Sequence, residues 1–533
     1  MVDVRYLPYL GFLAAVPVGG ALSIAVPFWG GAVLALGLAG SAIGTYDMLQ
    51  RKRAVLRNYP VLARMRFFLE SIRPEIRQYF LESDHDEVPF SREQRALVYR
   101  RAKNIEGLRP FGTLKNQQRV GHEWINHSMQ PSHIDSADFR VTFGAARAQP
   151  YHASVLNISG MSFGALSPNA VEALNIGAAR GNFCQTTGEG AISRFHAAHG
   201  GDLVWQIGSG YFGCRDAQGR FDPEAFAEKA TGAQVKMVEI KLSQGAKPGH
   251  GGILPGAKVT ELIAESRGVP VGVDCISPPS HSAFSTPIEM LEFLEQLRTL
   301  SGGKPAGLKL CVGHPWEVFA LAKAMIETGI QPDFITVDGS EGGTGAAPAE
   351  FADHLGAPLR EGLMLMHNTL VGLGLREGTR IVVSGKLISA FDLARAFSLG
   401  ADTCNMGRGF MFALGCIQAQ TCHSGRCPTG VTAQDPRRYK ALDVSDKAAR
   451  VANFHDNTLG TLKETIEACG LSHPADLGPE HLMMRINSRE VRSAQSQYDW
   501  VGPGELLDHN VAHPAFAKFW DMARADSFAP ARA

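Results

Sequence analysis

Three cysteines lie within twelve residues of this 533-residue chain, at Cys416, Cys422 and Cys427. Thiolates are the preferred protein ligands of iron–sulfur clusters and also bind zinc. Structural zinc sites usually have CxxC pairs and four ligands. This segment has no CxxC pair, and His423 is an awkward fourth ligand because its neighbour Cys422 is itself a candidate. The spacing therefore favours a three-thiolate [3Fe–4S] cluster, with unpaired buried cysteines as the alternative.

The composition limits the class of protein. The chain has nine cysteines, an odd number spread over a long sequence, unlike the disulfide framework of a small secreted domain. This distribution indicates a reducing compartment. Lys plus Arg number 52, as do Asp plus Glu, so no overall basic field attracts nucleic acid. We therefore predict no nucleic-acid partner.

Glycine-rich loops recur between residues 154 and 410, and the last of them have a composition that suits phosphate. They include Gly339–Gly345, Ser384–Lys386 and Gly407–Gly409. Backbone N–H groups of such loops bind phosphate at the mouth of barrel folds, and Arg408 offers a forked contact to the same group. Any one loop could simply make a turn, but together they predict a phosphorylated cofactor.

The apolar runs that precede these loops alternate with helical stretches, which is typical of a parallel sheet. Ser167-Pro168, for example, supplies the N-cap and first residue of a helix that Gly181 closes. Eight such runs predict an α/β fold, a (β/α)8 TIM barrel with its active site at the carboxyl ends of the strands. The predicted strands are 155–158, 183–187, 203–207, 237–242, 307–312, 334–337, 380–383 and 403–406.

The N-terminal region is strongly apolar: Tyr6 to Tyr46 contains no charged residue and no histidine. This length is about twice what one membrane span of roughly 20 residues needs. We predict a transmembrane helical hairpin, with helices at about 7–25 and 28–46 and with basic flanks on the cytoplasmic side. A cleaved signal peptide, which has a shorter apolar core, and a buried soluble helix pair are the alternatives. Charged amphipathic helices such as 63–82 follow and suggest a collar.

The loops and cysteines together resemble the FMN-binding synthase domain of glutamate synthase. The matching stretches, in consistent order between Ser154 and Asp435, are MSFGALS, TGEG, QGAKPGHGGILPGAKV, SPPSH, EGGTGAAP and GCIQAQTCHSGRCPTGV. The resemblance implies a (β/α)8 barrel with FMN at its mouth and a [3Fe–4S] cluster on the three cysteines.

The resemblance also implies roles for individual residues. The flavin contacts would be Met161, Ser162, Thr187, Gln206 and Lys309. The flavin phosphate would lie among Gly343, Gly345, Gly385, Gly407 and Arg408. The substrate, 2-oxoglutarate or its imine, would lie near Glu189, Gln244 and Lys247.

The chemistry of four of these residues agrees with catalytic roles. Lys309 can stabilise negative charge on the flavin ring, and Lys247 can pair with a substrate carboxylate that Gln244 orients. Glu189 can handle a proton on the imine nitrogen. Each of the four has an alternative as an ordinary salt bridge or hydrogen bond at the barrel rim.

The chain departs from glutamate synthase in three expected ways. Its first cysteine, Cys184, falls inside the barrel region, so we expect no amidotransferase domain that starts with a catalytic cysteine. We expect no long C-terminal β-helical domain, and the membrane hairpin is an addition. The predicted domains are the hairpin at 1–50, the helical collar or linker at 51–150, the FMN-binding barrel at 151–435 and a helical or irregular extension at 436–533.

We therefore predict an oxidoreductase that acts on CH–NH2 donors and converts 2-oxoglutarate plus ammonia into glutamate. An amino-acid or amine dehydrogenase that passes electrons to a membrane acceptor is the first alternative, and an electron-relay subunit of a larger complex is the second. The predicted partners are a 2-oxo acid or amino acid, an electron-donor or acceptor protein and the membrane, with homo-oligomerisation left open. The predicted location is the inner cell membrane, with the catalytic domain in the cytoplasm.

Overall fold

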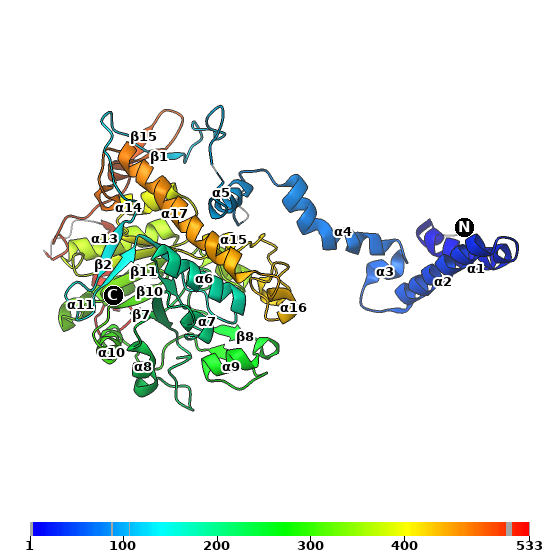
Figure 1. Ribbon diagram of the computed structural model, residues 1–533, viewed down its shortest axis with the longest axis horizontal. Helices are drawn as coiled ribbons and strands as arrows, with labels where there is room; N and C mark the ends of the chain where they lie inside the picture. Colours follow the sequence, from blue (N-terminus) through cyan, green and yellow to red (C-terminus); the bar gives the residue numbers. More distant parts are fainter. Residues whose placement is uncertain (1–3, 87–88, 106, 508–513, 532–533) are drawn as a thin grey trace. The chain divides into compact units, whose positions relative to one another are not determined.

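The protein is described here from a computed structural model, which covers residues 4–86, 89–105, 107–507 and 514–531. The chain divides into two compact units, residues 1–88 and residues 89–533 (Figure 1). The first unit is made of helices, and the second contains all the strands.

The second unit is built on a closed barrel of eight parallel strands, in the order β10-β11-β12-β13-β4-β5-β6-β7. Its strands are β4 (Leu156–Ile158), β5 (Gln185–Thr186), β6 (Leu203–Ile207), β7 (Val235–Lys241), β10 (Ala306–Leu310), β11 (Phe334–Asp338), β12 (Arg380–Ser384) and β13 (Thr403–Met406). Each strand overlaps one of the eight predicted runs. The prediction of an α/β TIM barrel is therefore confirmed.

Helices cover the outside of the barrel. They are α6 (Pro168–Gly181), α8 (Pro223–Ala230), α10 (Pro287–Leu300), α11 (Pro315–Thr328), α13 (Leu359–Gly372), α14 (Ala390–Ser398) and α15 (Arg408–Ala413), with the short α7 (Arg194–Ala197), α9 (Glu261–Arg267) and α12 (Ala349–His354) in loops. Helix α6 begins as predicted, with the Ser167 side chain accepting a hydrogen bond from the Ala170 nitrogen. It closes one residue beyond Gly181, because Asn182 adopts the left-handed conformation.

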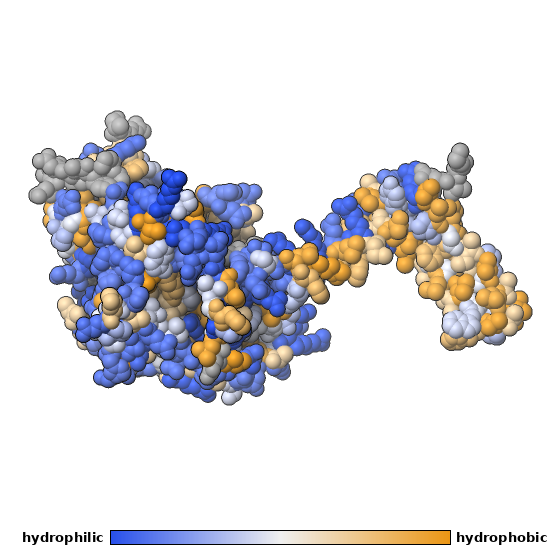
Figure 2. Space-filling view, turned by 90° about the horizontal axis from the view of Figure 1, so that it is seen from above, coloured by the Kyte–Doolittle hydropathy of each residue, from blue (hydrophilic) through white to orange (hydrophobic). Residues whose placement is uncertain are grey.

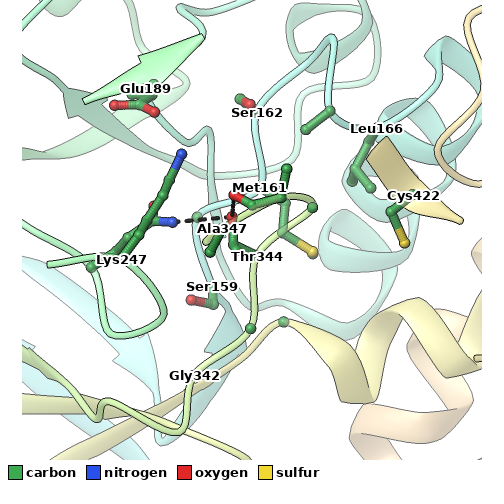
Figure 3. A pocket seen from close by; sticks show the side chains of 18 of the residues that line it. Ser159, Met161, Ser162, Leu166, Glu189, Lys247, Gly342, Thr344, Ala347 and Cys422 are labelled. Atoms are coloured by element: carbon green, nitrogen blue, oxygen red, sulfur yellow. Dashed lines mark hydrogen bonds between the residues drawn. The ribbon is translucent and has the colours of Figure 1, made fainter. Parts of the chain in front are cut away.

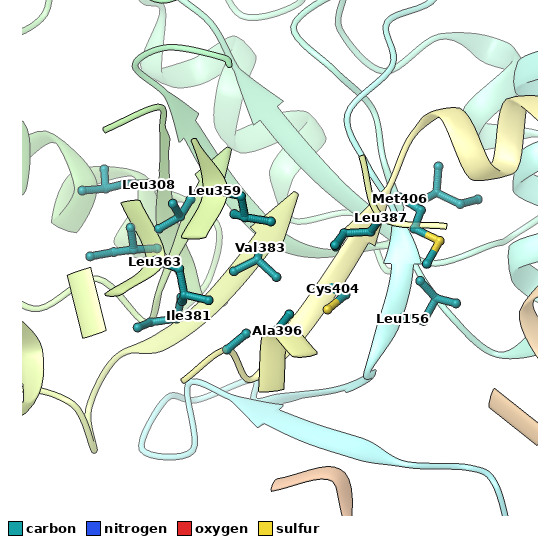
Figure 4. Close-up of a cluster of buried hydrophobic side chains, with 14 of the residues drawn as sticks. Leu156, Leu308, Leu359, Leu363, Ile381, Val383, Leu387, Ala396, Cys404 and Met406 are labelled. Carbon is teal, nitrogen blue, oxygen red and sulfur yellow. The ribbon is translucent and has the colours of Figure 1, made fainter. Parts of the chain in front are cut away.

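The core fills the space between the strands and these helices, as Figure 4 shows. Leu156, Val383 and Met406 come from strands, and Leu359 and Leu363 come from α13; all are buried. Strands that are covered on both faces need apolar side chains on both faces, which is why they read as continuous apolar runs in the sequence. The apolar runs thus determine both the barrel and its helical cover.

Two helices outside the barrel repeat, α17 (Val444–Ala468) and α5 (Arg92–Ala102), pack on each other, and α17 packs on α6. The close approach depends on Gly177, where an added methyl group would lie 2.4 Å from Cγ1 of Val451. Helix α5 begins with a capping box formed by Ser91 and Gln94. Its Tyr99 hydroxyl donates a 2.6 Å hydrogen bond to the carbonyl of Cys416, which connects α5 to the cysteine segment.

Short strands and turns complete the second unit. Strand β1 (Glu123–Ile125) pairs with β14 (Leu482–Arg485), which pairs with β15 (Val491–Ser493). Two hairpins are formed by β2 (Arg140–Phe143) with β3 (Tyr151–Ser154) and by β8 (Gly252–Leu254) with β9 (Cys275–Ser277). The region after the cysteines also has the short helices α16 (Pro436–Tyr439), α18 (Ala494–Gln497) and α19 (Pro514–Met522).

The first unit contains the predicted helical hairpin, α1 (Leu7–Ala25) and α2 (Pro27–Leu49). Both helices are long and apolar enough to cross a membrane, as those of an anchor or a signal sequence would be. Glycines allow their close contact: an added methyl group at Gly30 would lie 2.1 Å from the backbone of Ser23. Helices α3 (Ala54–Asn58) and α4 (Ala63–Ile76) follow, and the π-helical turn η2 (Arg77–Leu81) continues α4.

Candidate active site

A cavity of about 530 Å³ opens at the carboxyl ends of the barrel strands. Its walls include Lys309 at the end of β10, Asp338 of β11, Ser384 of β12 and Met406 of β13. Ligand sites of small molecules typically have volumes of about 300–1,000 Å³. Eleven of the thirteen residues predicted to contact the flavin or the substrate line this cavity: Met161, Ser162, Glu189, Gln244, Lys247, Lys309, Gly343, Gly345, Gly385, Gly407 and Arg408.

Thr187 and Gln206 are not among the lining residues, although the resemblance places them against the flavin. Both side chains are buried. The Gln206 side chain donates a hydrogen bond to Glu239, and the Gln206 backbone N–H donates to the Thr187 hydroxyl at 3.2 Å. An added methyl group at Gly160, which does line the cavity, would lie 3.0 Å from the Gln206 amide. Gln206 therefore lies directly behind Gly160 in the cavity wall, and Thr187 is bonded to it.

Lys309 is a buried cation in the cavity wall. Its Nζ lies 3.5 Å from Oδ2 of Asp338. Burial by itself would lower the pKa of Lys309, but the carboxylates of Asp338 and Glu239 outweigh it and raise that pKa above its ordinary value. Asp338 also accepts hydrogen bonds from the Gly245 nitrogen at 2.9 Å and from the Ser384 hydroxyl at 2.6 Å. One carboxylate thus holds a charged side chain, the loop after β7 and the end of β12 in place.

Glu189 lies at one end of the cavity among cations. Its Oε2 is 2.8 Å from Nζ of Lys241, and the Lys247 side chain points toward it (Figure 3). Burial opposes ionisation of Glu189, but Lys241, Lys247 and Arg267 outweigh burial and hold its pKa below the usual value. Glu189 is therefore a carboxylate at neutral pH, and it can accept an N–H hydrogen bond or a proton.

Lys247 and Gln244 come from the long loop after β7. Burial lowers the pKa of Lys247, and the negative charge of Glu189 raises it by a smaller amount. The Gln244 amide donates to the Thr344 hydroxyl at 3.3 Å. The loop is thereby tied to the glycine segment after β11.

Sequence reasoning missed two charged residues of this site, Lys241 and Arg267. Arg267, at the end of α9, lines the cavity and is buried. Its Nη2 donates to the Phe163 carbonyl at 3.0 Å, while its Nε has no hydrogen-bond partner in the described part of the chain. A lone arginine on a short helix and a lysine at a strand end carry no pattern that would single them out.

The glycine segments meet at the other end of the cavity. The Arg408 guanidinium lies against Gly343, where an added methyl group would be 2.5 Å from Nη2, and Nη2 donates to the Thr344 carbonyl at 2.8 Å. An added methyl group at Gly345 would meet nothing within 4 Å. Backbone N–H groups and a guanidinium beside open space form a donor set for an anion. These residues fit the phosphate of a cofactor such as FMN.

The three clustered cysteines follow α15. Cys422 lines the cavity, at the side away from Glu189 and Lys247 in Figure 3, and Cys427 is buried. In the described ranges no three His, Cys, Asp or Glu side chains are assembled as a metal site, and the cysteines are free. Burial opposes ionisation of Cys427, but hydrogen bonds from Thr429 and Thr432 lower its pKa. The donor chemistry suits thiolate ligation, while the cluster itself stays a prediction.

Comparisons with known proteins agree on one group. Residues 118–472 match the family model described as a conserved region in glutamate synthase. The glutamate synthase large subunit-like protein YerD of Bacillus subtilis is 37% identical over 481 residues, which cover 82% of this chain and 91% of that protein. The archaeal-type glutamate synthase (NADPH) of Thermotoga neapolitana is 36% identical over 318 residues, and the match covers 58% of each chain.

A solved structure of a mandelate oxidase variant with (S)-mandelic acid also matches, with a TM-score of 0.41 and 14% identity. That match covers 70% of this chain and 86% of the oxidase.

Proposed function

Because this chain belongs to the glutamate synthase family and is an oxidoreductase of that type, we propose that it makes glutamate from 2-oxoglutarate and ammonia. In the balanced reaction, 2-oxoglutarate, an ammonium ion, two electrons and two protons give glutamate and water. One observation carries the proposal: a single cavity has a carboxylate among three cations at one end and a glycine–arginine cradle at the other.

The cradle would hold FMN by its phosphate, with Gly343, Gly345, Gly385, Gly407 and Arg408 as the donors. When bound, FMN supplies the two-electron reduction of a carbon–nitrogen double bond. Met161 and Ser162 would contact the ring system. Lys309, kept protonated by Asp338, would place a fixed positive charge beside it.

The substrate carboxylates would pair with Lys247 and Arg267. The Lys247 ammonium is half-buried, and the pKa of this group, lowered by burial, would rise again when an anion binds. The buried Arg267 guanidinium lines the cavity, and it would pair with the second substrate carboxylate. Gln244, already bonded to Thr344, would orient the substrate between these cations.

Glu189 would act on the nitrogen. Its ionised carboxylate would attract an ammonium ion, take a proton from it and hold the N–H groups of the imine that forms. Lys241, at 2.8 Å, keeps Glu189 ionised for this role. We assign Lys241 as a positioning residue because it acts through Glu189.

Cys416, Cys422 and Cys427 would hold the [3Fe–4S] cluster, which supplies electron-relay chemistry for an electron-donor protein. The pKa of Cys416, which burial raises to about 11, also responds to the charges of Cys422 and Cys427, so the three sulfur atoms share one region. The apolar hairpin would anchor the protein in the inner membrane, with residues 89–533 in the cytoplasm.

The test uses the full-length protein with its cofactors, reduced under anaerobic conditions and mixed with 2-oxoglutarate plus ammonium in a stopped-flow instrument. Flavin absorbance should return faster than in buffer, and it should need both reactants. Reoxidation no faster than in buffer would refute this substrate pair.

A second function, an amino-acid dehydrogenase that delivers electrons to a membrane acceptor, is favoured by one observation. Two helices are long and apolar enough to cross a membrane, and glutamate synthesis by itself needs no membrane. A panel of amino acids mixed with the oxidised protein distinguishes the two functions. Bleaching of the flavin by glutamate or by another amino acid, at a rate above the synthetic rate, would favour the dehydrogenase.

A further inference from the structure

The segment that follows the apolar hairpin carries an apolar stripe that the described residues of its unit leave partly or fully exposed. In α4 and η2, Met65, Phe68, Leu69 and Tyr79 are exposed to between 50% and 59%. Ile72 and Ile76 continue the same line, since the positions 65, 68, 72, 76 and 79 recur at helical spacing. Figure 2 shows this segment with orange residues along one side and blue residues along the other.

The orientation of α4 relative to the hairpin is fixed by a buried carboxylate. Asp47, in the last turn of α2, is fully buried and lies 2.6 Å from Nη2 of Arg64, near the start of α4. The Arg64 Nε donates to the same carboxylate at 3.0 Å, and so does the Val61 backbone N–H, also at 3.0 Å. The apolar stripe therefore starts beside the end of the hairpin and keeps a set direction.

Basic residues border the stripe. Between residues 51 and 77 the chain has eight Lys or Arg residues and two Glu residues. Arg66, Arg73 and Arg77 are exposed and follow one another at helical spacing along one edge of the stripe. Long arginine side chains at such an edge can keep their charges among lipid headgroups while their stems cover apolar surface.

We propose that α4 lies in the headgroup layer of an anionic membrane, with Met65, Phe68, Leu69, Ile72 and Ile76 toward the acyl chains. An interfacial helix of this kind buries its apolar face about 5–10 Å into the headgroup boundary. The excess of basic residues matches anionic lipid, and continuity with an apolar hairpin places the stripe at the level of a membrane surface. This inference rests on the membrane anchor of the proposed function.

The experiment uses the full-length protein in lipid nanodiscs, with an environment-sensitive fluorescent amino acid at Leu69 or, as the matched control, at Ser71. Ser71 is also exposed on α4 but lies off the stripe. The nanodiscs contain brominated phosphatidylcholine, with or without phosphatidylglycerol. We expect quenching at least about twofold stronger at position 69 than at 71, and stronger with phosphatidylglycerol than without it.

A double charge reversal, Arg66→Glu with Arg73→Glu, should reduce the quenching at position 69 in the anionic discs and leave it nearly unchanged in discs of phosphatidylcholine alone. Equal quenching at positions 69 and 71 would overturn the proposal. So would a reporter at position 69 that is shielded from water but not quenched by bromine, because a partner protein would then cover the stripe. Protein that never enters the discs would refute the membrane anchor itself, together with this inference.

Discussion

Lys241 Nζ lies 2.8 Å from Oε2 of Glu189, where both side chains are largely shielded from water. Lys241 ends strand β7, and Glu189 lies in the loop after β5. Because the carboxyl ends of parallel strands meet at one rim of the barrel, residues 52 positions apart in the sequence form an ion pair there. The pair sets the charge state of the group proposed to handle the substrate nitrogen.

Replacing Lys241 by Gln should raise the pKa of Glu189, because burial raises this pKa and the positive charge of Lys241 lowers it. Glu189 would become protonated at higher pH, and the acid limb of the pH profile of kcat/KM should move to higher pH. Lys236→Gln, on the same strand but paired with Asp202, is the control. An unchanged acid limb in Lys241→Gln would show that Lys241 does not act through Glu189.

Replacing Arg267 by Gln should weaken 2-oxoglutarate binding while the bound flavin is retained. Loss of one member of a buried charge pair costs about 2 kcal/mol or more, so the Kd should rise about 30-fold or more. Titration of the flavin absorbance with 2-oxoglutarate measures this Kd. An unchanged Kd would remove Arg267 from the substrate site.

Replacing Gly188 by Ala should destabilise the protein more than the same change at Gly200. Both glycines have left-handed backbone angles, φ 70° and φ 73°, so each alanine costs about 1 kcal/mol of strain. Only at Gly188 does the added methyl group meet backbone, 2.5 Å from the Ser162 nitrogen; at Gly200 nothing lies within 4 Å. We expect at least about 1 kcal/mol of extra destabilisation.

Denaturant unfolding of the two glycine variants, with the flavin content of each, measures this difference. The Ser162 loop lines the cavity, so Gly188→Ala should also lose flavin more readily. Equal free energies of unfolding for the two variants would contradict the close packing of these two loops.

Each of the variants Cys416→Ser, Cys422→Ser and Cys427→Ser should lack the iron and acid-labile sulfide of the proposed cluster, because a three-thiolate site has no spare ligand. Cys469→Ser is the control, since Cys469 is also free and partly exposed. Iron analysis and paramagnetic resonance of the purified proteins make the measurement. Full iron content in any of the three variants would exclude that cysteine as a ligand.

The sequence predicted the barrel well because burial on both faces leaves a strong signal. All eight strands were located, and β6 and β13 match their predicted bounds to the residue. The glycine loops were equally visible, since few residues replace glycine where backbone approaches a ligand. What strand runs and loop composition cannot show is which side chains from distant loops converge, and Lys241 and Arg267 escaped notice for that reason.

The sequence also could not predict how deep in the barrel the side chain of each strand residue lies. Gln206 lies on a predicted strand, and the resemblance implies that it contacts the flavin; its amide bonds to Glu239, and the flavin contact stays a prediction. Whether a strand residue points into the cavity or into the layer beneath it depends on the register of the neighbouring strands, here Gln206 opposite Glu239. Short strands such as β1 and β14, which pair across a long sequence distance, carry too few residues to show a pattern.

The most direct test of the proposed function is product analysis of a single turnover. The reduced holoprotein is mixed anaerobically with 2-oxoglutarate and nitrogen-15 ammonium, and the products are analysed by mass spectrometry. The proposal predicts nitrogen-15 glutamate in an amount equal to the flavin that is reoxidised. The Glu189→Gln variant should form labelled glutamate more slowly. Flavin that stays reduced, with no labelled glutamate, would contradict the proposal.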